Sequence, residues 1–272
     1  MSEISITPLG TVAPYPKNNK NCPGFLVKYK DYNIMLDCGN GCTSLLNMNE
    51  DLNNLTIFIS HLHPDHYGDL VSLLQTLSVY KKYGYVNKYP EIYLPPTIVY
   101  EYEDYIDKDG WSVSKPIETN ILDYRYINKY ARDIGIYIND LKSSDIINID
   151  DLNISNIIVP HPVESHAIKI ENDDFKIVYS SDTGTKNELR SFAKNADLFI
   201  CESSFLRGQY RENDYHLYAY ESAMIARDAK VKKLLLTHFW PEIEKDKYLE
   251  EAKQYFENVE VAQEGEKLIL RR

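Results

Sequence analysis

One short segment of the chain, residues 60–66 with the sequence SHLHPDH, holds His61, His63, Asp65 and His66. Zinc binds imidazole nitrogen and carboxylate oxygen at about 2.0–2.2 Å. His61 and His63 are two residues apart, so their side chains point the same way in an extended backbone. Pro64 ends that extension, and we expect Asp65 and His66 to face a second cation. A solvated polar loop is the alternative, but with seven histidines in 272 residues three at this spacing seldom meet by chance.

Three further side chains suited to metal binding stand at the ends of predicted strands. His161, Asp182 and His238 each follow an apolar run, and rigid strand ends can bring distant side chains together accurately. Asp182 could bridge two metals through its two oxygens. Taken alone, each of these residues would more often be a capped or solvated residue. Together with the cluster in residues 60–66, metal binding becomes the better interpretation. We leave out His166, for which a packing role and a substrate-facing role are equally suitable.

The elements that must position these residues are short apolar strands and amphipathic helices. Hairpins mixed with strand-helix units predict an α/β sandwich with helices outside two sheets, in one domain over residues 1–272. Residues 97–151 are the part whose elements the sequence indicates least, and they hold helical fragments and an acidic run. The periodicity predicts strands over 4–9, 25–29, 34–36, 55–59, 91–94, 154–159, 167–170, 175–179, 198–201, 233–237 and 268–270, and helices over 69–80 (N-capped by Asp69), 187–194, 218–229 and 246–256.

Composition and charge narrow the class of protein. The chain is 43% hydrophobic and 26% charged, as in ordinary globular proteins. It lacks an apolar run of about 18 residues and the basic start of a signal peptide, so we expect no membrane span. The four cysteines show no disulfide framework, which favours a reduced, cytoplasmic setting. The net charge of −11 would repel folded RNA, so the expected partner is a small-molecule substrate and nucleic acid is not favoured.

Several motifs together resemble the metallo-β-lactamase fold superfamily, and most closely its ribonuclease Z-like branch with the small bacterial hydrolases beside it. The resemblance spans nearly the whole chain and implies an αββα sandwich of two mixed β-sheets with helices on the outer faces. The motifs are DCG at 37–39, HLHPDHYGD at 61–69, HP at 161–162, SDTG at 181–184, His216 before an alanine-containing helix, and LTHF at 236–239.

This resemblance implies a centre of two Zn²⁺ ions, with Mn²⁺ or iron as alternatives. Asp182 and a hydroxide would bridge the two metals, and a bridging hydroxide would be the nucleophile. The ligands implied for one zinc are His61, His63 and His161, and those for the other are Asp65, His66 and His238.

The resemblance also implies two catalytic residues. Asp65 would accept a proton from the attacking water, and His216 would donate one to the leaving group. The alternative for His216 is a structural place next to a helix N-cap in a tyrosine-rich loop. Glu202 and Thr237 are candidates to orient metal ligands, although Glu202 also fits a solvated strand end.

The chain departs from true ribonuclease Z in one respect. That family inserts a long tRNA-gripping arm between the ligands that match His161 and Asp182, where only twenty residues stand here. We therefore expect a binuclear zinc hydrolase of the phosphodiesterase type acting on a small or short substrate, and a homodimer because the branch commonly dimerises. The alternatives are a tRNA 3′ endonuclease, a di-iron redox protein and a non-catalytic metal-binding module. His63 argues against the di-iron protein, because those relatives typically carry glutamate at that position.

Overall fold

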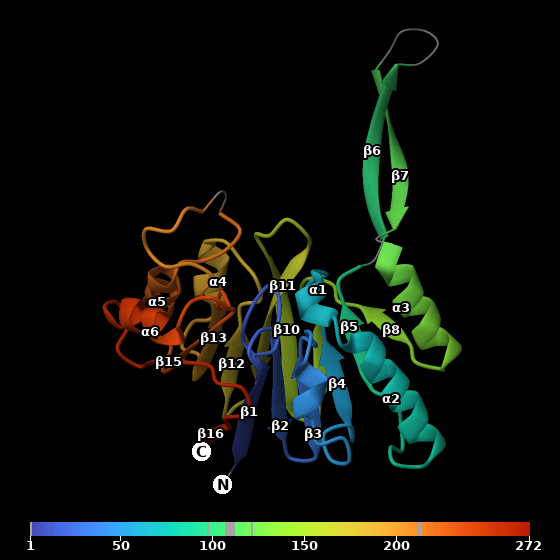
Figure 1. The fold of residues 1–272 in the computed structure, drawn as a ribbon, viewed down its shortest axis with the longest axis horizontal. Coiled ribbons are helices and arrows are strands. Elements are labelled where there is room, and N and C mark those ends of the chain that lie inside the picture. Colours follow the sequence, from blue (N-terminus) through green and yellow to red (C-terminus); the bar gives the residue numbers. More distant parts are fainter. Residues whose placement is uncertain (1, 97, 107–111, 121, 212–213) are drawn as a thin grey trace.

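Two seven-stranded sheets pack face to face, with helices on the outer side of each (Figure 1). The computed structural model describes residues 2–96, 98–106, 112–120, 122–211 and 214–272. A separate two-stranded sheet, β6 with β7, stands out from this body. Within the described part of the chain, no helix has the length and apolar character needed to cross a membrane.

The first sheet has the order β16-β1-β2-β3-β4-β5-β8. Its hairpins pair antiparallel and β3, β4, β5 and β8 pair parallel. Helix α2 buries a stripe of leucines against its outer face at helical spacing. The bounds are β1 Glu3–Gly10, β2 Gly24–Tyr29, β3 Tyr32–Leu36, η1 Cys42–Leu45, β4 Leu55–Phe58, α1 Pro64–Tyr67, α2 Leu70–Lys82, β5 Glu91–Leu94, α3 Leu122–Asp133, β8 Ile138–Asp140 and β16 Leu268–Arg271.

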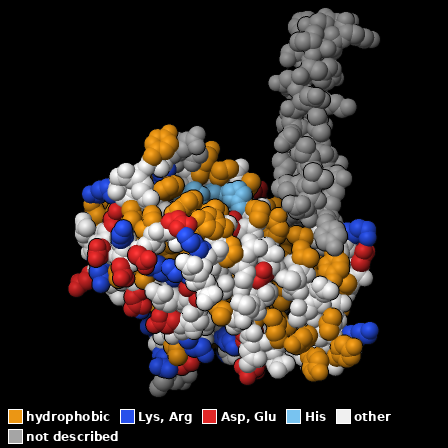
Figure 2. All heavy atoms as spheres, viewed as in Figure 1, with side chains coloured by type: hydrophobic (Ala, Val, Ile, Leu, Met, Phe, Trp, Pro, Cys, Tyr) orange, Lys and Arg blue, Asp and Glu red, His pale blue; other side chains and the backbone are white. Residues whose placement is uncertain are grey.

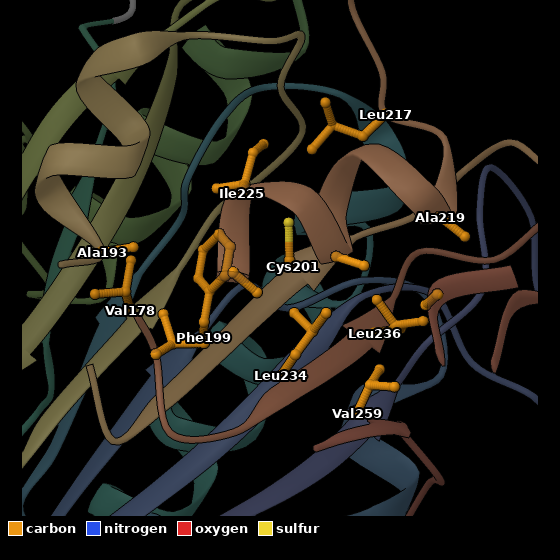
Figure 3. Packing of buried hydrophobic residues seen from close by; sticks show 14 of the residues in the cluster. Val178, Ala193, Phe199, Cys201, Leu217, Ala219, Ile225, Leu234, Leu236 and Val259 are labelled. Atoms are coloured by element: carbon orange, nitrogen blue, oxygen red, sulfur yellow. The ribbon is translucent and has the colours of Figure 1, made fainter. Parts of the chain in front are cut away.

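The second sheet has the order β15-β14-β13-β12-β11-β10-β9. Helix α5 presents small residues such as Ala219 and Ala223 to this sheet, which lets it approach Phe199 and Leu234 closely (Figure 3). The bounds are β9 Ile146–Ile149, β10 Leu152–Val159, β11 Ser165–Glu171, β12 Lys176–Tyr179, α4 Asn187–Phe192, β13 Leu198–Glu202, α5 Ala219–Asp228, β14 Leu234–Thr237, α6 Lys245–Lys253 and β15 Val259–Val261.

A third apolar cluster lies between the two sheets and includes Phe25, Phe58 and Phe175. Strands β13 and β14 are buried on both faces, as expected for parallel strands covered on both sides. Because β12, β13 and β14 run parallel, their carboxyl ends meet at one edge. Rigid strands therefore aim several side chains at a single place.

Most predicted elements occur, with ends shifted by a few residues. Within the described part of residues 97–151, the prediction of helical fragments is confirmed by α3 alone, and the remaining elements are strands rather than helices. These strands are β8, β9 and the hairpin β6 (Ile98–Ile106) with β7 (Ser112–Asn120). Asp69 does stand at the N-cap of α2, but its carboxylate accepts hydrogen bonds from Gly41 and Thr43 rather than from the helix.

Candidate metal centre

Metal-binding side chains from both sheets gather at the carboxyl ends of the strands. The segment after β4 brings His61 and His63, and the short helix α1, which begins at Pro64, brings Asp65 and His66. From the second sheet come His161 after β10, Asp182 after β12 and His238 after β14. Histidine side chains reach the surface at the upper edge of the body (Figure 2).

Three residues just after strands have left-handed backbones that turn the chain sharply at this edge. Asp37, Ser181 and His238 have φ values of 61°, 56° and 62°. Such a conformation costs a residue other than glycine about 1–3 kcal/mol and often occurs at functional sites. The surrounding strands hold this strain in place.

Three imidazole nitrogens converge in the first group of ligands. Nδ1 of His63 lies 3.2 Å from Nε2 of His61 and 3.0 Å from Nε2 of His161. Tetrahedral ligands about 2.05 Å from a zinc ion are separated by about 3.3 Å. A single proton cannot be shared by three nitrogens, whereas a single metal cation can bind all three. The four side chains His61, His63, His161 and Asp182 form a group that could hold a metal.

The second group is Asp65, His66 and His238. Oδ2 of Asp65 lies 3.7 Å from Nε2 of both histidines. Asp182 lies between the groups, with Oδ1 3.3 Å from His66 Nε2 and Oδ2 3.0 Å from His238 Nε2 and 3.6 Å from His61 Nε2. Among the described residues, His66 Nε2, His238 Nε2 and Asp182 Oδ1 are buried and, although they lie close to one another, none makes a hydrogen bond of acceptable geometry. Buried polar atoms rarely remain unpaired, so these donors fit a bound metal.

Burial and charge act differently on the two halves of this cluster. Burial lowers the pKa of His61 well below its usual value and that of His161 to about 4, which leaves their rings neutral. Burial alone would also lower the pKa of His66 and His238, but Asp182 and its neighbours outweigh it and raise both. Without a metal these two histidines hold protons beside carboxylates. A divalent cation would replace those protons, as metal binding usually does.

The Asp37 carboxylate orients one of these ligands, a role that the sequence interpretation did not assign to it. Its Oδ2 lies 2.7 Å from His66 Nδ1 and accepts hydrogen bonds from the Tyr179 hydroxyl (2.7 Å) and Ser60 Oγ (2.8 Å). Its Oδ1 accepts from the Ser60 amide at 2.6 Å. The ring nitrogen Nε2 of His66 is thereby directed at the second group. A carboxylate behind a ligand histidine is a common support in zinc sites.

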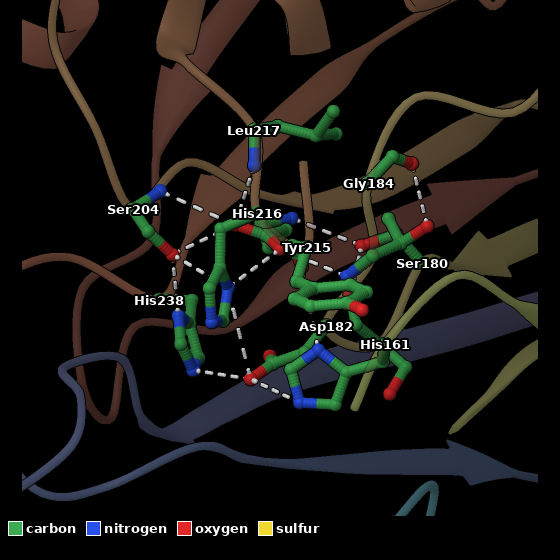
Figure 4. Close-up of polar contacts among 12 residues, drawn as sticks. His161, Ser180, Asp182, Gly184, Ser204, Tyr215, His216, Leu217 and His238 are labelled. Atoms are coloured by element: carbon green, nitrogen blue, oxygen red, sulfur yellow. Dashed lines mark hydrogen bonds and ion pairs between the residues drawn. The ribbon is translucent and has the colours of Figure 1, made fainter. Parts of the chain in front are cut away.

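His216 lies over the cluster with its ring held by Glu202. Its Nδ1 is 3.0 Å from Glu202 Oε1, and its ring stacks on that of His238 at 5.4 Å (Figure 4). Burial alone lowers the pKa of His216, but the Glu202 carboxylate outweighs it and the net shift is upward. His216 also forms a third group of candidate ligands with Asp182 and His238.

The sequence did not decide the roles of Glu202, Thr237 and His166, and the structure shows where each of them lies. Glu202 is buried at the end of β13, where Oε2 accepts a hydrogen bond from Ser204 Oγ at 2.7 Å, and Ser204 Oγ lies 2.8 Å from His238 Nδ1. Thr237 is buried, and its hydroxyl has no hydrogen-bond partner among the described residues, so it does not orient a ligand in this way. His166 lies apart from the three ligand groups, between Asn156 and Glu164.

A cavity of about 470 Å³ opens over the cluster. Its floor includes His63, Asp65 and Asp182, and its walls include His216, Phe205 and Trp240. Trp240 is 43% exposed and meets Tyr15 edge to face at 6.1 Å. Cavities of this size hold small ligands.

Comparisons with known proteins agree with the fold. The chain is 27% identical over 295 residues to a ribonuclease Z of Archaeoglobus fulgidus, covering 96% of each protein. The crystal structure of the metallo-β-lactamase fold protein YhfI of Bacillus subtilis superposes with a TM-score of 0.81, at 23% identity, over 98% of this chain and 99% of that one. A diphosphatase of the PhnP family superposes with a TM-score of 0.69, at 14% identity, over 98% and 97%.

These likenesses confirm the metallo-β-lactamase sandwich and the resemblance to the ribonuclease Z-like branch. A more specific match comes from the family described as Anti-Pycsar protein Apyc1, whose sequence model covers residues 4–262 of the chain. That range contains both sheets except β16 and every candidate ligand. The chain therefore belongs to the Anti-Pycsar protein Apyc1 family.

Proposed function

We propose that this protein is a binuclear zinc-dependent hydrolase of the phosphodiesterase type that acts on a small or short substrate. The observation that carries the proposal is the pair of ligand groups with Asp182 between them. One zinc would be held by His61, His63 and His161, the other by Asp65, His66 and His238, and both by Asp182. Bound zinc would supply Lewis acidity, lowering the pKa of a water and polarising a phosphoryl oxygen.

Two side chains next to these ligands would move protons. Asp65 lines the cavity floor and can take a proton from the attacking water. His216 lies on the cavity wall with its Nδ1 directed at Glu202, which leaves Nε2 free of that contact to protonate the leaving oxygen. Since an alkoxide leaving group needs a proton far more than a phenolate does, His216 matters most for substrates with poor leaving groups.

The cavity and the charge of the chain support a small substrate. A volume of about 470 Å³ suits a small ester rather than a folded polymer. The net charge of −11 disfavours long polyanions. The phosphoryl preference is supported by the names of similar proteins, a ribonuclease Z and a diphosphatase, and fold alone does not decide it.

The test compares the zinc-loaded protein with the His216→Ala variant on phosphodiesters with good and poor leaving groups. We expect kcat for an alkyl leaving group to fall about 100- to 10,000-fold in the variant, the usual contribution of a general acid, and the p-nitrophenyl ester to suffer far less. Metal content should stay the same. Thioesters, lactones and a precursor tRNA are screened in parallel, and faster turnover of one of these would replace the proposed substrate class.

A further inference from the structure

The loop between β13 and α5 carries His216 together with two arginines, Arg207 and Arg211. Glu202 Oε1 lies 3.0 Å from Nδ1 of the His216 ring, and Glu202 Oε2 accepts a hydrogen bond from the Leu217 amide at 3.2 Å. These contacts fix the ring and the residue after it. They do not hold the His216 carbonyl, which accepts a hydrogen bond from Arg211 instead.

We propose that Arg211 is a positioning residue that sets the place of His216 through its main chain, an inference that rests on the proposed role of His216 as proton donor. Arg211 Nη1 donates a hydrogen bond to the His216 carbonyl at 2.7 Å. The Arg211 side chain is only 13% exposed, so this bond is largely shielded from water. A hydrogen bond from a charged donor in such a setting is stronger than a neutral one.

The guanidinium is itself anchored on helix α5. Nη1 donates to Glu221 Oε2 at 2.7 Å, and Nη2 pairs with Asp214 Oδ1 at 2.8 Å. The guanidinium carbon Cζ lies over the Tyr218 ring, 4.5 Å from its centre. Glu221 belongs to the first turn of α5, and its Oε2 also accepts a hydrogen bond from the Tyr218 amide at 3.0 Å. The His216 carbonyl is thus tied to the helix start through one carboxylate.

This combination of contacts needs an arginine. A guanidinium presents five N–H donors in a rigid plane and stacks on aromatic rings, whereas a lysine ammonium is a point charge on a flexible stem. Arg211→Lys keeps the charge next to Glu221 but cannot hold Glu221, Asp214 and the His216 carbonyl at once in the arrangement that the guanidinium gives them. Displacement of a catalytic group by about 1 Å can cost about 100-fold in rate.

Arg207 offers a matched control in the same loop. Its guanidinium lies over the rings of Tyr220 (4.5 Å) and Tyr255 (5.5 Å), and its amide donates to Glu251. It therefore fastens the loop to α6, away from the His216 carbonyl. Arg207→Lys removes a stacked guanidinium of similar kind, and it should leave the proton donor in place.

The experiment uses the zinc-loaded wild type, Arg211→Lys, Arg207→Lys and His216→Ala. For a phosphodiester with an alkyl leaving group we expect Arg211→Lys to lower kcat about 10- to 100-fold with KM within about twofold, and Arg207→Lys to change little. In proton–carbon spectra of histidine-labelled protein, the His216 resonance is identified by its loss in His216→Ala. It should shift or broaden in Arg211→Lys alone, with zinc content unchanged in both arginine variants.

The outcomes separate this inference from the proposed function. An Arg211→Lys protein with wild-type kcat and an unmoved His216 resonance overturns the positioning role. If His216→Ala keeps full activity on poor leaving groups, the proposed function of His216 fails, and the resonance alone then decides whether Arg211 places that histidine. Equal shifts in both arginine variants would also overturn the inference, because they would mean a general loosening of the loop.

Discussion

Asp182 is a side chain that lies next to both groups of candidate ligands. Its two oxygens lie 3.3 Å from His66 Nε2 and 3.0 Å from His238 Nε2. We expect Asp182→Ala to lose at least one of two metal equivalents, because both groups lose a negatively charged oxygen at once. Elemental analysis of the purified protein measures this. Glu164→Gln, which alters a carboxylate outside the ligand groups, is the control, and unchanged metal content in Asp182→Ala would contradict a bridging role.

A substitution at Asp37 tests how much a residue that contacts a ligand histidine, without binding the metal itself, contributes to zinc affinity. We expect Asp37→Asn to weaken zinc binding about 10- to 100-fold, the usual effect of removing such a carboxylate, because an amide is a weaker acceptor for the His66 ring N–H. Competition with a chromogenic chelator measures the affinity. Tyr179→Phe removes a neighbouring hydrogen bond to the same Asp37 oxygen and should cost much less; equal losses would assign the effect to general disruption.

At the level of residues, spacing alone could predict the cluster but not its supports. The histidines of residues 60–66 and the strand-end positions of His161, Asp182 and His238 carry a pattern that zinc chemistry explains. Ser204 is an ordinary polar residue in the sequence, and Asp37 belongs to the DCG motif without a role assigned to it there; their contacts to His238 and His66 join positions 34 and 29 residues apart. Only the packed sheets bring these pairs together, so no local pattern could reveal them.

At the level of elements, the hairpin β6–β7 is separable from the sandwich. Its strands pair with each other and belong to neither large sheet, and Ile98 pairs with Asn120, so a short linker can replace residues 98–120. We expect this deletion to leave metal content and the unfolding temperature unchanged, and to alter kcat/KM for extended substrates more than for a small p-nitrophenyl ester. Loss of zinc or of folding would show that the hairpin supports the site.

The sequence prediction of elements failed where two signals competed. Residues 100–103, YEYE, alternate tyrosine with an acidic residue, a period of two that is typical of a strand. Asp104 then breaks the alternation, and the segment is predicted as an acidic run instead. Strands buried on both faces, such as β13 and β14, were predicted well because a short apolar run between turns has few other interpretations.

At the level of the whole molecule, the two sheets are joined at both ends. The candidate ligands join them at the carboxyl ends of β12 and β14. At the opposite edge, Asp197 precedes β13 of the second sheet and pairs with Arg272, which follows β16 of the first. The homodimer expected from the sequence remains a prediction that light scattering in solution can test.

Asp197 makes the stability of this opposite edge depend on pH. Burial alone raises the pKa of its carboxyl, but Lys232, the Lys176 amide and Arg272 outweigh it and lower the pKa. A lowered folded pKa means that the stabilisation is complete above the unfolded value of about 3.9 and is lost as the pH falls through the folded value. Protonation therefore removes it only in acid.

We accordingly expect Asp197→Asn to lower the free energy of unfolding by about 1 kcal/mol at pH 7, a modest value because Lys232 is exposed. The difference from wild type should begin to shrink as the pH falls below about 4, and it should vanish below the lowered folded pKa, where the wild-type carboxyl becomes neutral like the amide. Urea unfolding at each pH measures it, with a chelator present throughout so that metal loss does not contribute. Asp228→Asn, which breaks only exposed ion pairs, should change little at either pH. A difference between Asp197→Asn and wild type that stays constant from neutral pH into acid would show that the charge of Asp197 is not what joins the sheets there.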